Sequence, residues 1–203
     1  MESIKWKSLV TTSLVCLLPV VLGVVLWDKL PGEMAIHFNL KNEPDNFASR
    51  TVGVLLLPFI MFLCQVICCV TIDIAAFKSK ETVKGEKFAK WLLPILTIAL
   101  QMATLGYNIN NSMDIRRIIS VIAGVFFFVT GIYLPKLDYV KNKKVDKETA
   151  RKINKFTGDL TTILGALFVA SVFFEPIATT VCLLLVIPYS IICVVYAFIV
   201  SRK

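Results

Sequence analysis

The chain contains six long apolar runs, separated by segments that hold all of the charged residues. Overall 57% of the residues are apolar and only 18% are charged, whereas soluble domains carry about 25% charged residues. A soluble fold of this size could not cover so much apolar surface. The sequence therefore predicts an all-α integral membrane protein, because a helix satisfies its own backbone polar groups in lipid.

A hydrocarbon core about 30 Å thick needs roughly 17–25 helical residues to cross it. The fifth run has 15 residues and should extend into the segment before it. The first run has no small-residue cleavage site after it, so we expect a retained helix and not a secretory signal. The six predicted spans are Leu9–Trp27, Val52–Ile72, Trp91–Ile109, Ile118–Leu134, Leu160–Phe174 and Ala178–Val200.

The charges between the runs predict how the chain is oriented. Of the 22 lysines and arginines, 17 lie in the two terminal segments and in the loops after the second and fourth runs, and 5 lie in the loops after the first and third. Cytoplasmic loops carry the excess of Lys and Arg, so we expect both termini inside. The net charge of +8 then reflects contact with anionic membrane lipids, and no nucleic acid is expected as a partner.

We expect two parts in this arrangement. Residues 1–77 form a two-span unit with an outer loop at 28–51, and residues 78–203 form a four-span unit with an inner loop at 135–159. The apolar runs hold no charged residue, and Asp73 should be solvated at the end of the second run. Ion-coupled transporters usually carry a charged group at mid-depth, so the sequence disfavours a pump.

A few polar and small side chains do lie inside the runs. Gln65, Gln101 and Thr104 are expected to bridge helices by hydrogen bonds, and a polar path through the bundle is the alternative. The fifth run carries the small residues Gly165, Ala166, Ala170 and Ser171, with Ala166 and Ala170 one turn apart. Small residues at that spacing let helices approach closely, so we expect the fifth span to be central.

Prolines punctuate four of the runs. Pro19 and Pro188 lie near the middle of their spans and should kink them, because each removes a backbone donor and clashes with the preceding turn. Pro58 and Pro94 lie nearer the ends. A Leu-Pro pair recurs in the first three runs, which hints at an internal repeat but is too short to establish one.

The outer loop, residues 28–51, mixes apolar side chains with turn formers and charged groups. Residues 35–40 alternate enough to form a short extended stretch, and residues 42–45 are typical of a turn. Either the loop is a folded cap in which His37 and Asp45 bond to each other, or its face binds a partner. The residues expected to structure this loop or to bind the partner are Pro31, His37, Asn39, Glu43, Pro44, Asp45 and Arg50.

The inner loop ends in a segment that predicts a basic amphipathic helix. Asp146 can cap its N-terminus, and Glu148 and Lys152 form a favourable i,i+4 pair. We expect this helix to lie on the inner headgroups and to run into the fifth span, as an anchor or as a docking site for a soluble partner. The basic residues of this face are Lys143, Lys144, Lys147, Arg151, Lys152 and Lys155.

Neither a metal nor a cofactor is expected. All six cysteines lie inside apolar runs and His37 is the single histidine, so no Cys/His ligand set is available. His37 also has no nucleophile close to it in sequence. No catalytic cluster is visible, and an enzyme is therefore disfavoured.

The outer loop resembles a known pattern. The resemblance is carried by Leu30-Pro31, Ile36-His37-Phe38-Asn39, Glu43-Pro44-Asp45-Asn46-Phe47 and Arg50. These residues are similar to the N-terminal domain of the SdpI family, bacterial multi-span proteins named for immunity to a killing toxin. Ala35, Asn42 and Arg50 stand where the family usually has Pro, Gly and Lys, and Asn tolerates a left-handed backbone better than most residues.

The second half of the chain resembles the family in short segments. Gly131–Lys136 and Asn154–Gly158 are similar to two family motifs, whereas residues 138–144 replace a Gly-x-Arg-Thr-Pro-Trp stretch. The resemblance implies a non-enzymatic self-protection protein in the cytoplasmic membrane of a Gram-positive bacterium, with an extracellular peptide toxin as its partner. It also implies a signalling role in which a cytoplasmic repressor is drawn to the membrane. A transporter or exporter of small solutes or peptides is the alternative.

Overall fold

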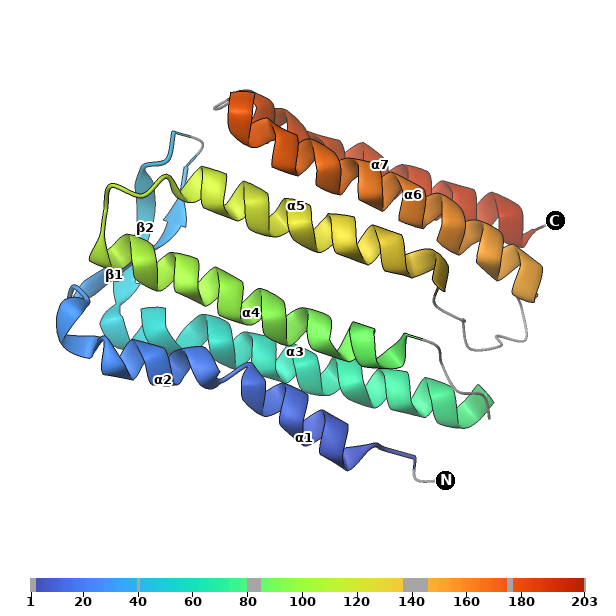
Figure 1. Ribbon diagram of the computed structural model, residues 1–203, viewed down its shortest axis with the longest axis horizontal. Helices are drawn as coiled ribbons and strands as arrows, with labels where there is room; N and C mark the ends of the chain where they lie inside the picture. Colours follow the sequence, from blue (N-terminus) through green and yellow to red (C-terminus); the bar gives the residue numbers. More distant parts are fainter. Residues whose placement is uncertain (1–2, 40, 80–84, 137–145, 175–176, 203) are drawn as a thin grey trace. The chain divides into compact units, whose positions relative to one another are not determined.

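The computed structural model describes residues 3–39, 41–79, 85–136, 146–174 and 177–202. Figure 1 shows its elements along the chain. The helices are α1 (Trp6–Val15), α2 (Leu18–Val25), α3 (Arg50–Ser79), α4 (Glu86–Ile109), α5 (Ile115–Tyr133), α6 (Lys147–Ser171) and α7 (Ile177–Ser201), with short 3-10 turns η1 (Trp27–Lys29), η2 (Leu134–Lys136) and η3 (Val172–Phe174). The strands are β1 (Glu33–Phe38) and β2 (Pro44–Ser49).

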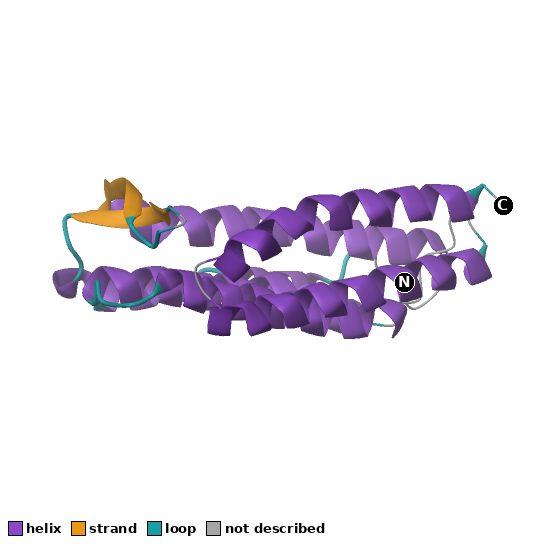
Figure 2. Ribbon diagram, turned by 90° about the horizontal axis from the view of Figure 1, so that it is seen from above, coloured by secondary structure: helices purple, strands orange, loops and turns teal. Residues whose placement is uncertain are grey.

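Six helical segments of the described chain are long and apolar enough to cross a membrane: α1 together with α2, and then α3 to α7. The predicted class, an all-α protein with six membrane-spanning helices, is confirmed. The two strands form a single small hairpin, drawn in orange in Figure 2. The chain is thus a multi-pass membrane protein, and the assignment of one end to the cytoplasm stays a prediction.

The first span is broken where Pro19 enters it. Helix α1 ends at Val15 and α2 begins at Leu18, with Pro19 in the first turn of α2. A proline at that position loses no helical hydrogen bond, since the first N–H groups of a helix have no partner in it. At Pro19 the span is therefore interrupted between two helices, where a kink within one helix was expected. Helix α7 is continuous through Pro188.

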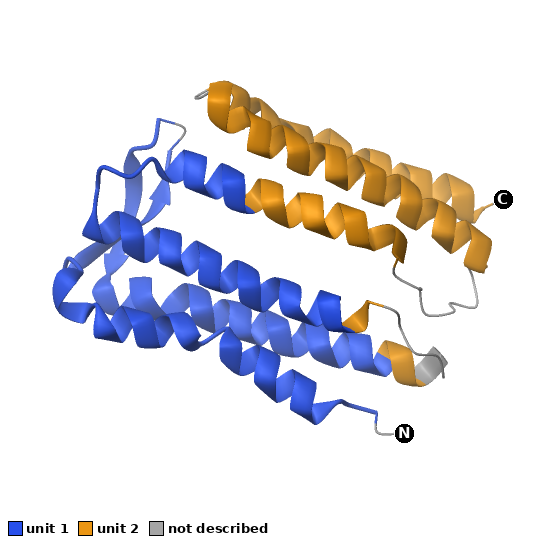
Figure 3. Ribbon diagram, in the orientation of Figure 1, with its two compact units in different colours: residues 1–74, 87–122 blue, residues 75–86, 123–203 orange. Residues whose placement is uncertain are grey.

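The structure divides into two compact units, coloured in Figure 3. Unit 1 contains residues 1–74 and 87–122, and unit 2 contains residues 75–86 and 123–203. The predicted division at residue 77 stays a prediction, whereas unit 1 holds the third span and the start of α5 together with the first two spans. The third span is joined to the second by a set of polar contacts between α3 and α4, described below.

Within unit 2, glycines set the distance between α5 and α6. A methyl group on Gly165 would collide with the backbone nitrogen of Phe128, and one on Gly131 with the backbone nitrogen of Thr162. Helix α6 also packs on α7, where the Thr161 and Tyr189 hydroxyls lie 2.7 Å apart. Of the small residues expected to allow a close approach, Gly165 does so, whereas Ala166 and Ala170 are exposed.

Candidate functional site

The outer loop folds as an antiparallel hairpin. Strand β1 pairs with β2 in a register that places Met34 opposite Ala48 and Ala35 opposite Phe47, with irregularities on either side of His37. The extended stretch expected at residues 35–40 is present as far as Phe38, and β2 was not predicted. The sequence of β2 does not resemble a strand, because it contains several polar residues and begins with Pro44. Proline is nevertheless tolerated as the first residue of an edge strand.

The turn between the strands depends on two asparagines. Asn39 Oδ1 accepts hydrogen bonds from the main-chain N–H groups of Lys41 at 2.8 Å and Glu43 at 3.0 Å. Asn42 has a φ of 65°, the left-handed region that asparagine adopts more readily than most residues. The replacement of the family's usual glycine by Asn42 is therefore compatible with the turn, as expected.

Asn42 also reaches out of the hairpin. Its Oδ1 accepts hydrogen bonds from the N–H groups of Ile115 at 2.9 Å and Arg116 at 3.4 Å, the first two residues of α5. These N–H groups lack partners inside their own helix. Asn42 thus caps α5 from a distant segment, a role that glycine could not fill.

A second asparagine holds the other side of the hairpin. Asn108, near the end of α4, accepts from the Ala35 N–H at 2.8 Å through Oδ1 and donates to the Ala35 carbonyl at 3.0 Å through Nδ2. The side-chain amide therefore bonds Ala35 as a neighbouring strand would. Asn108 is buried, and sequence analysis did not identify it.

Apolar and cationic contacts complete the attachment. Met34 is fully buried in a cluster with Leu30, Val54 and Leu105. Arg50 donates from its backbone N–H to the Gly32 carbonyl at 2.9 Å and from Nε to the Pro31 carbonyl at 3.1 Å. Its guanidinium lies 5.2 Å from the Trp27 ring centroid. The hairpin is thus fixed to the helices of unit 1.

His37 and Asp45 make the expected contact. Nδ1 of His37 lies 2.5 Å from Oδ1 of Asp45, but the two side chains are 66% and 42% exposed. Exposed pairs of this kind contribute about 0–1 kcal/mol. The buried Asn108 and Met34, with the half-buried Asn42, therefore hold the hairpin more strongly than this pair does. We expect His37→Ala to change thermal stability little.

We predict that Asn42→Gly and Asn42→Asp separate the turn from the cap. Glycine keeps the positive φ but loses the cap, and should lower the free energy of unfolding in detergent by about 0.5–2 kcal/mol. Aspartate keeps an acceptor for the α5 N–H groups. The free energy of unfolding of Asn42→Asp should therefore be close to that of the parent chain. Equal losses for the two variants would show that the cap contributes nothing.

Below the hairpin, α3 and α4 exchange polar contacts that we call the Pro–Gln clasp (Pro58, Gln65, Pro94 and Gln101). A proline leaves the carbonyl four residues before it without a helical donor. Gln65 Nε2 donates to the Lys90 carbonyl at 2.7 Å, the group freed by Pro94. Gln101 Nε2 donates to the carbonyls of Gly53 at 2.9 Å and Val54 at 3.4 Å, and Pro58 frees the second of these.

The Pro–Gln clasp is reciprocal. In both helices a Leu-Leu-Pro segment is followed seven residues later by glutamine, and each glutamine serves the carbonyl that the other helix's proline leaves free. The expectation that Gln65 and Gln101 bridge helices is confirmed, whereas the Thr104 hydroxyl donates to the Leu100 carbonyl of its own helix. Four pairs of corresponding positions in the two antiparallel helices are buried: Val54 and Lys90, Pro58 and Pro94, Gln65 and Gln101, and Cys69 and Leu105. The Leu-Pro pattern is therefore part of a longer repeat, in which α3 and α4 share the same spacing of proline, glutamine and buried positions.

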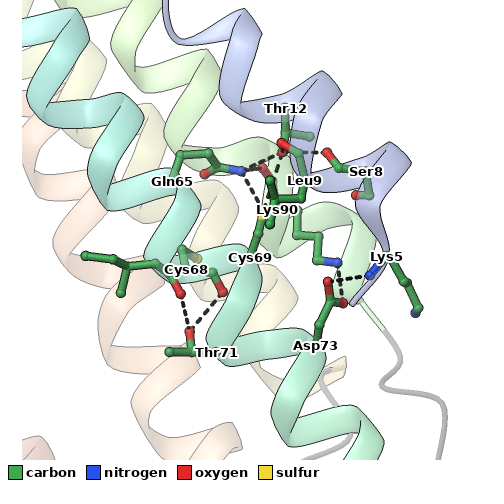
Figure 4. Close-up of polar contacts among 11 residues, drawn as sticks. Lys5, Ser8, Leu9, Thr12, Gln65, Cys68, Cys69, Thr71, Asp73 and Lys90 are labelled. Carbon is green, nitrogen blue, oxygen red and sulfur yellow. Dashed lines mark hydrogen bonds and ion pairs between the residues drawn. The ribbon is translucent and has the colours of Figure 1, made fainter. Parts of the chain in front are cut away.

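A buried ion pair lies at the opposite end of unit 1 from the hairpin. Lys90 Nζ is 2.6 Å from Asp73 Oδ1, and both side chains are 1% exposed. The N–H of Lys5 donates to Asp73 Oδ2 at 3.0 Å. Figure 4 shows these contacts beside those of Gln65 with Thr12 and Cys69. The expectation that Asp73 is solvated was wrong, because α1 and α4 cover it.

The sequence does contain a signal for this pair. Gln65, Cys69 and Asp73 are spaced four residues apart and so lie on one face of α3. Such a polar stripe beside apolar residues indicates contact with other helices. Two acceptors in this region stay unused, because the buried Oε1 atoms of Gln65 and Gln101 have no hydrogen-bond partner among the described residues.

The basic inner segment is the first part of α6. Asp146 Oδ1 accepts from the N–H groups of Glu148 and Thr149, each at 2.9 Å, and the hydroxyl of Thr149 donates to Oδ2 at 2.7 Å. These hydrogen bonds hold the pKa of Asp146 below its ordinary value, and the bond from the Thr149 hydroxyl has the largest effect. The expected cap and the Glu148–Lys152 pair, at 2.7 Å, are both present. Its exposed basic residues are Lys147, Arg151, Lys152 and Lys155, while Lys143 and Lys144 lie outside the described residues.

These features define a multi-pass membrane protein with a fixed hairpin at one end and a buried polar network beneath it. Residues 14–62 match the family model of a domain of unknown function, DUF1648, which is found at the N-terminus of SdpI-like membrane proteins. The match covers the hairpin and parts of its flanking helices, but not α4. No curated protein and no solved structure matches the chain.

Proposed function

We propose that this chain is a non-enzymatic immunity protein of the SdpI type, which protects the producing bacterium from an extracellular peptide toxin at its cytoplasmic membrane. The matched domain supports the proposal, since it holds the hairpin residues that carry the resemblance. The second half supports it less, because the family's Gly-x-Arg-Thr-Pro-Trp stretch is replaced.

The single observation that carries the proposal is the fixed but exposed hairpin. Asn42, Asn108 and Met34 attach it to the helices, while Glu43 and Asp45 stay exposed to solvent. A surface that is already ordered loses little conformational entropy when it binds a partner. The hairpin is therefore suited to recognition, and its acidic groups suit a cationic peptide.

Expression in a sensitive strain tests this function. Cells that carry the intact chain are expected to survive the secreted peptides of the producing strain at concentrations that kill cells with an empty vector. Immunodetection in the membrane fraction is the control for insertion. Equal killing of both strains, with the protein correctly inserted, would refute the proposal.

We also propose that the inner face has a separate role in relaying the presence of toxin. Lys147, Arg151, Lys152 and Lys155 are exposed at the start of α6, where they can contact anionic headgroups or an acidic surface of a cytoplasmic regulator. Neutralising Lys143, Lys144 and Lys147 should then change recruitment of that regulator. It should leave protection intact, because the toxin acts on the other side.

Transport is the second candidate, and the buried network favours it. A charged pair inside a bundle of spans and two unused amide acceptors are common in substrate and ion pathways. Solute or peptide flux into liposomes would support transport. Flux that persists in Gln65→Leu and Gln101→Leu proteins would exclude a path along the Pro–Gln clasp.

A further inference from the structure

The two edges of the hairpin are not equivalent. On β1, the N–H and the carbonyl of Ala35 both bond the Asn108 side chain, so both groups point away from β2. In an antiparallel pair, opposite residues alternate between those that bond each other and those whose polar groups point outward. Ala35 therefore belongs to a pair of the outward kind.

Phe47 lies directly opposite Ala35, so its N–H and carbonyl point away from β1. The next contacts along the hairpin agree with this alternation, because Arg50 and Gly32 do bond across the strands at 2.9 Å. Among the described residues the sheet has two strands. The outer edge of β2 at Phe47 thus pairs with no strand, whereas Asn108 closes the edge of β1.

An edge strand with free polar groups attracts further strands unless lysines, prolines or bulges protect it. Pro44 and the irregularity between the pairs His37–Asn46 and Phe38–Pro44 protect the start of β2. Residues 47–49 pair regularly with β1 and contain neither lysine nor proline. Phe47 itself is 52% exposed beside this edge. A peptide that binds here could form main-chain hydrogen bonds with the strand edge and an apolar contact with the Phe47 ring.

The charge around this edge selects its partner. Glu33, Glu43 and Asp45 are exposed, and Lys41 is the one lysine between residues 33 and 49. This surface repels anionic headgroups and attracts a cationic peptide. A second copy of the hairpin would bring the same acidic groups and is disfavoured.

We propose that the outer edge of β2 at Phe47 binds an extended segment of a cationic, amphipathic peptide, which joins the hairpin as a third strand. The inference rests on the proposed function, because it describes how the toxin peptide is held. Main-chain hydrogen bonds provide affinity in strand addition, and alternate side chains provide selectivity. Here Phe47 contacts an apolar residue of the added strand, and Glu43 and Asp45 attract its basic ones.

The test uses the full chain in nanodiscs of zwitterionic lipid and a synthetic peptide of alternating lysine and valine, about ten residues long. The same peptide with every backbone nitrogen methylated keeps its charge and side chains but cannot donate. We expect the unmodified peptide to bind and the methylated one to bind at least about tenfold more weakly. Empty nanodiscs measure adsorption to lipid.

Variants at Phe47 test the site. Phe47→Pro removes the outward N–H without touching a bond of the hairpin, and should weaken binding at least about tenfold. Phe47→Ala keeps the N–H and should bind more tightly than Phe47→Pro. Equal binding of the two peptides would overturn strand addition whether or not Phe47→Pro folds. Dimers of the free protein that Phe47→Pro abolishes, but that persist when peptide is added, would assign the edge to a second copy and also overturn it.

Protection and strand addition can fail separately. If the chain protects cells but binds the methylated peptide as tightly as the unmodified one, the proposed function is supported and strand addition is refuted. If the chain binds peptide through the Phe47 edge but never protects cells, strand addition is supported and the immunity function is refuted.

Discussion

Replacing Asp73 with alanine is expected to lower the free energy of unfolding by about 3–5 kcal/mol, because it removes the carboxylate that balances a buried ammonium group. Lys90 Nζ lies 2.6 Å from that carboxylate, and both side chains are 1% exposed. The substitution also removes the acceptor of the Lys5 N–H. Unfolding in mixed micelles of increasing denaturing-detergent content measures the loss.

An exposed ion pair of nearly equal length is the matched control. Lys152 and Glu148 lie 2.7 Å apart on α6, with side chains that are 59% and 78% exposed. Glu148→Ala should therefore leave stability unchanged within error. Replacing both buried partners, Asp73→Leu with Lys90→Met, should restore much of what Asp73→Ala loses. If Asp73→Ala is as harmless as Glu148→Ala, water reaches the pair and its burial has no energetic consequence.

Gly165→Ala is expected to destabilise the protein by about 1–3 kcal/mol, because the added methyl group meets backbone atoms of α5 that cannot move independently. The methyl carbon would collide with the Phe128 nitrogen and lie 2.7 Å from the Gly124 carbonyl oxygen. Thermal unfolding in detergent measures the effect. The sign is informative, since alanine is otherwise favoured over glycine inside a helix by about 1 kcal/mol.

Gly106→Ala on α4 is the control for helix propensity. The nearest atom to its added methyl carbon is the Met113 Sδ at 3.4 Å, the flexible end of a side chain. This change should be neutral or stabilising. If Gly165→Ala behaves in the same way, the close approach of α5 and α6 is not required.

The spans were predictable because hydropathy is a local property of the sequence. The apolar runs predicted all six helices. The helices are longer than the runs where adjacent polar residues are also helical. For example, the fifth run has 15 residues but α6 has 25, because Asp146 caps a basic segment that runs directly into the span. The cap and the Glu148–Lys152 pair were predictable for the same reason.

The attachment of the hairpin was not predictable, because its contacts join distant segments. Asn108 bonds Ala35, and Asn42 caps Ile115, each across more than 70 positions of the sequence. A single sequence does not reveal such pairs. The Pro–Gln clasp was predictable in part: the repeated Leu-Pro pairs and the two glutamines were visible, but their reciprocal use of freed carbonyls requires α3 and α4 to lie side by side.

We propose that the outer hairpin recognises the toxin and that the basic inner face does not. This division is tested by the survival of sensitive cells exposed to the producing strain's peptides. One strain expresses a chain with Glu43→Lys and Asp45→Lys, and another a chain with Lys143, Lys144 and Lys147 changed to Gln. We expect the outer variant to lose protection, more so at low salt where charges are screened least, and the inner variant to protect as the parent chain does. Full protection by the outer variant and none by the inner one, with both correctly inserted, would contradict this division of roles.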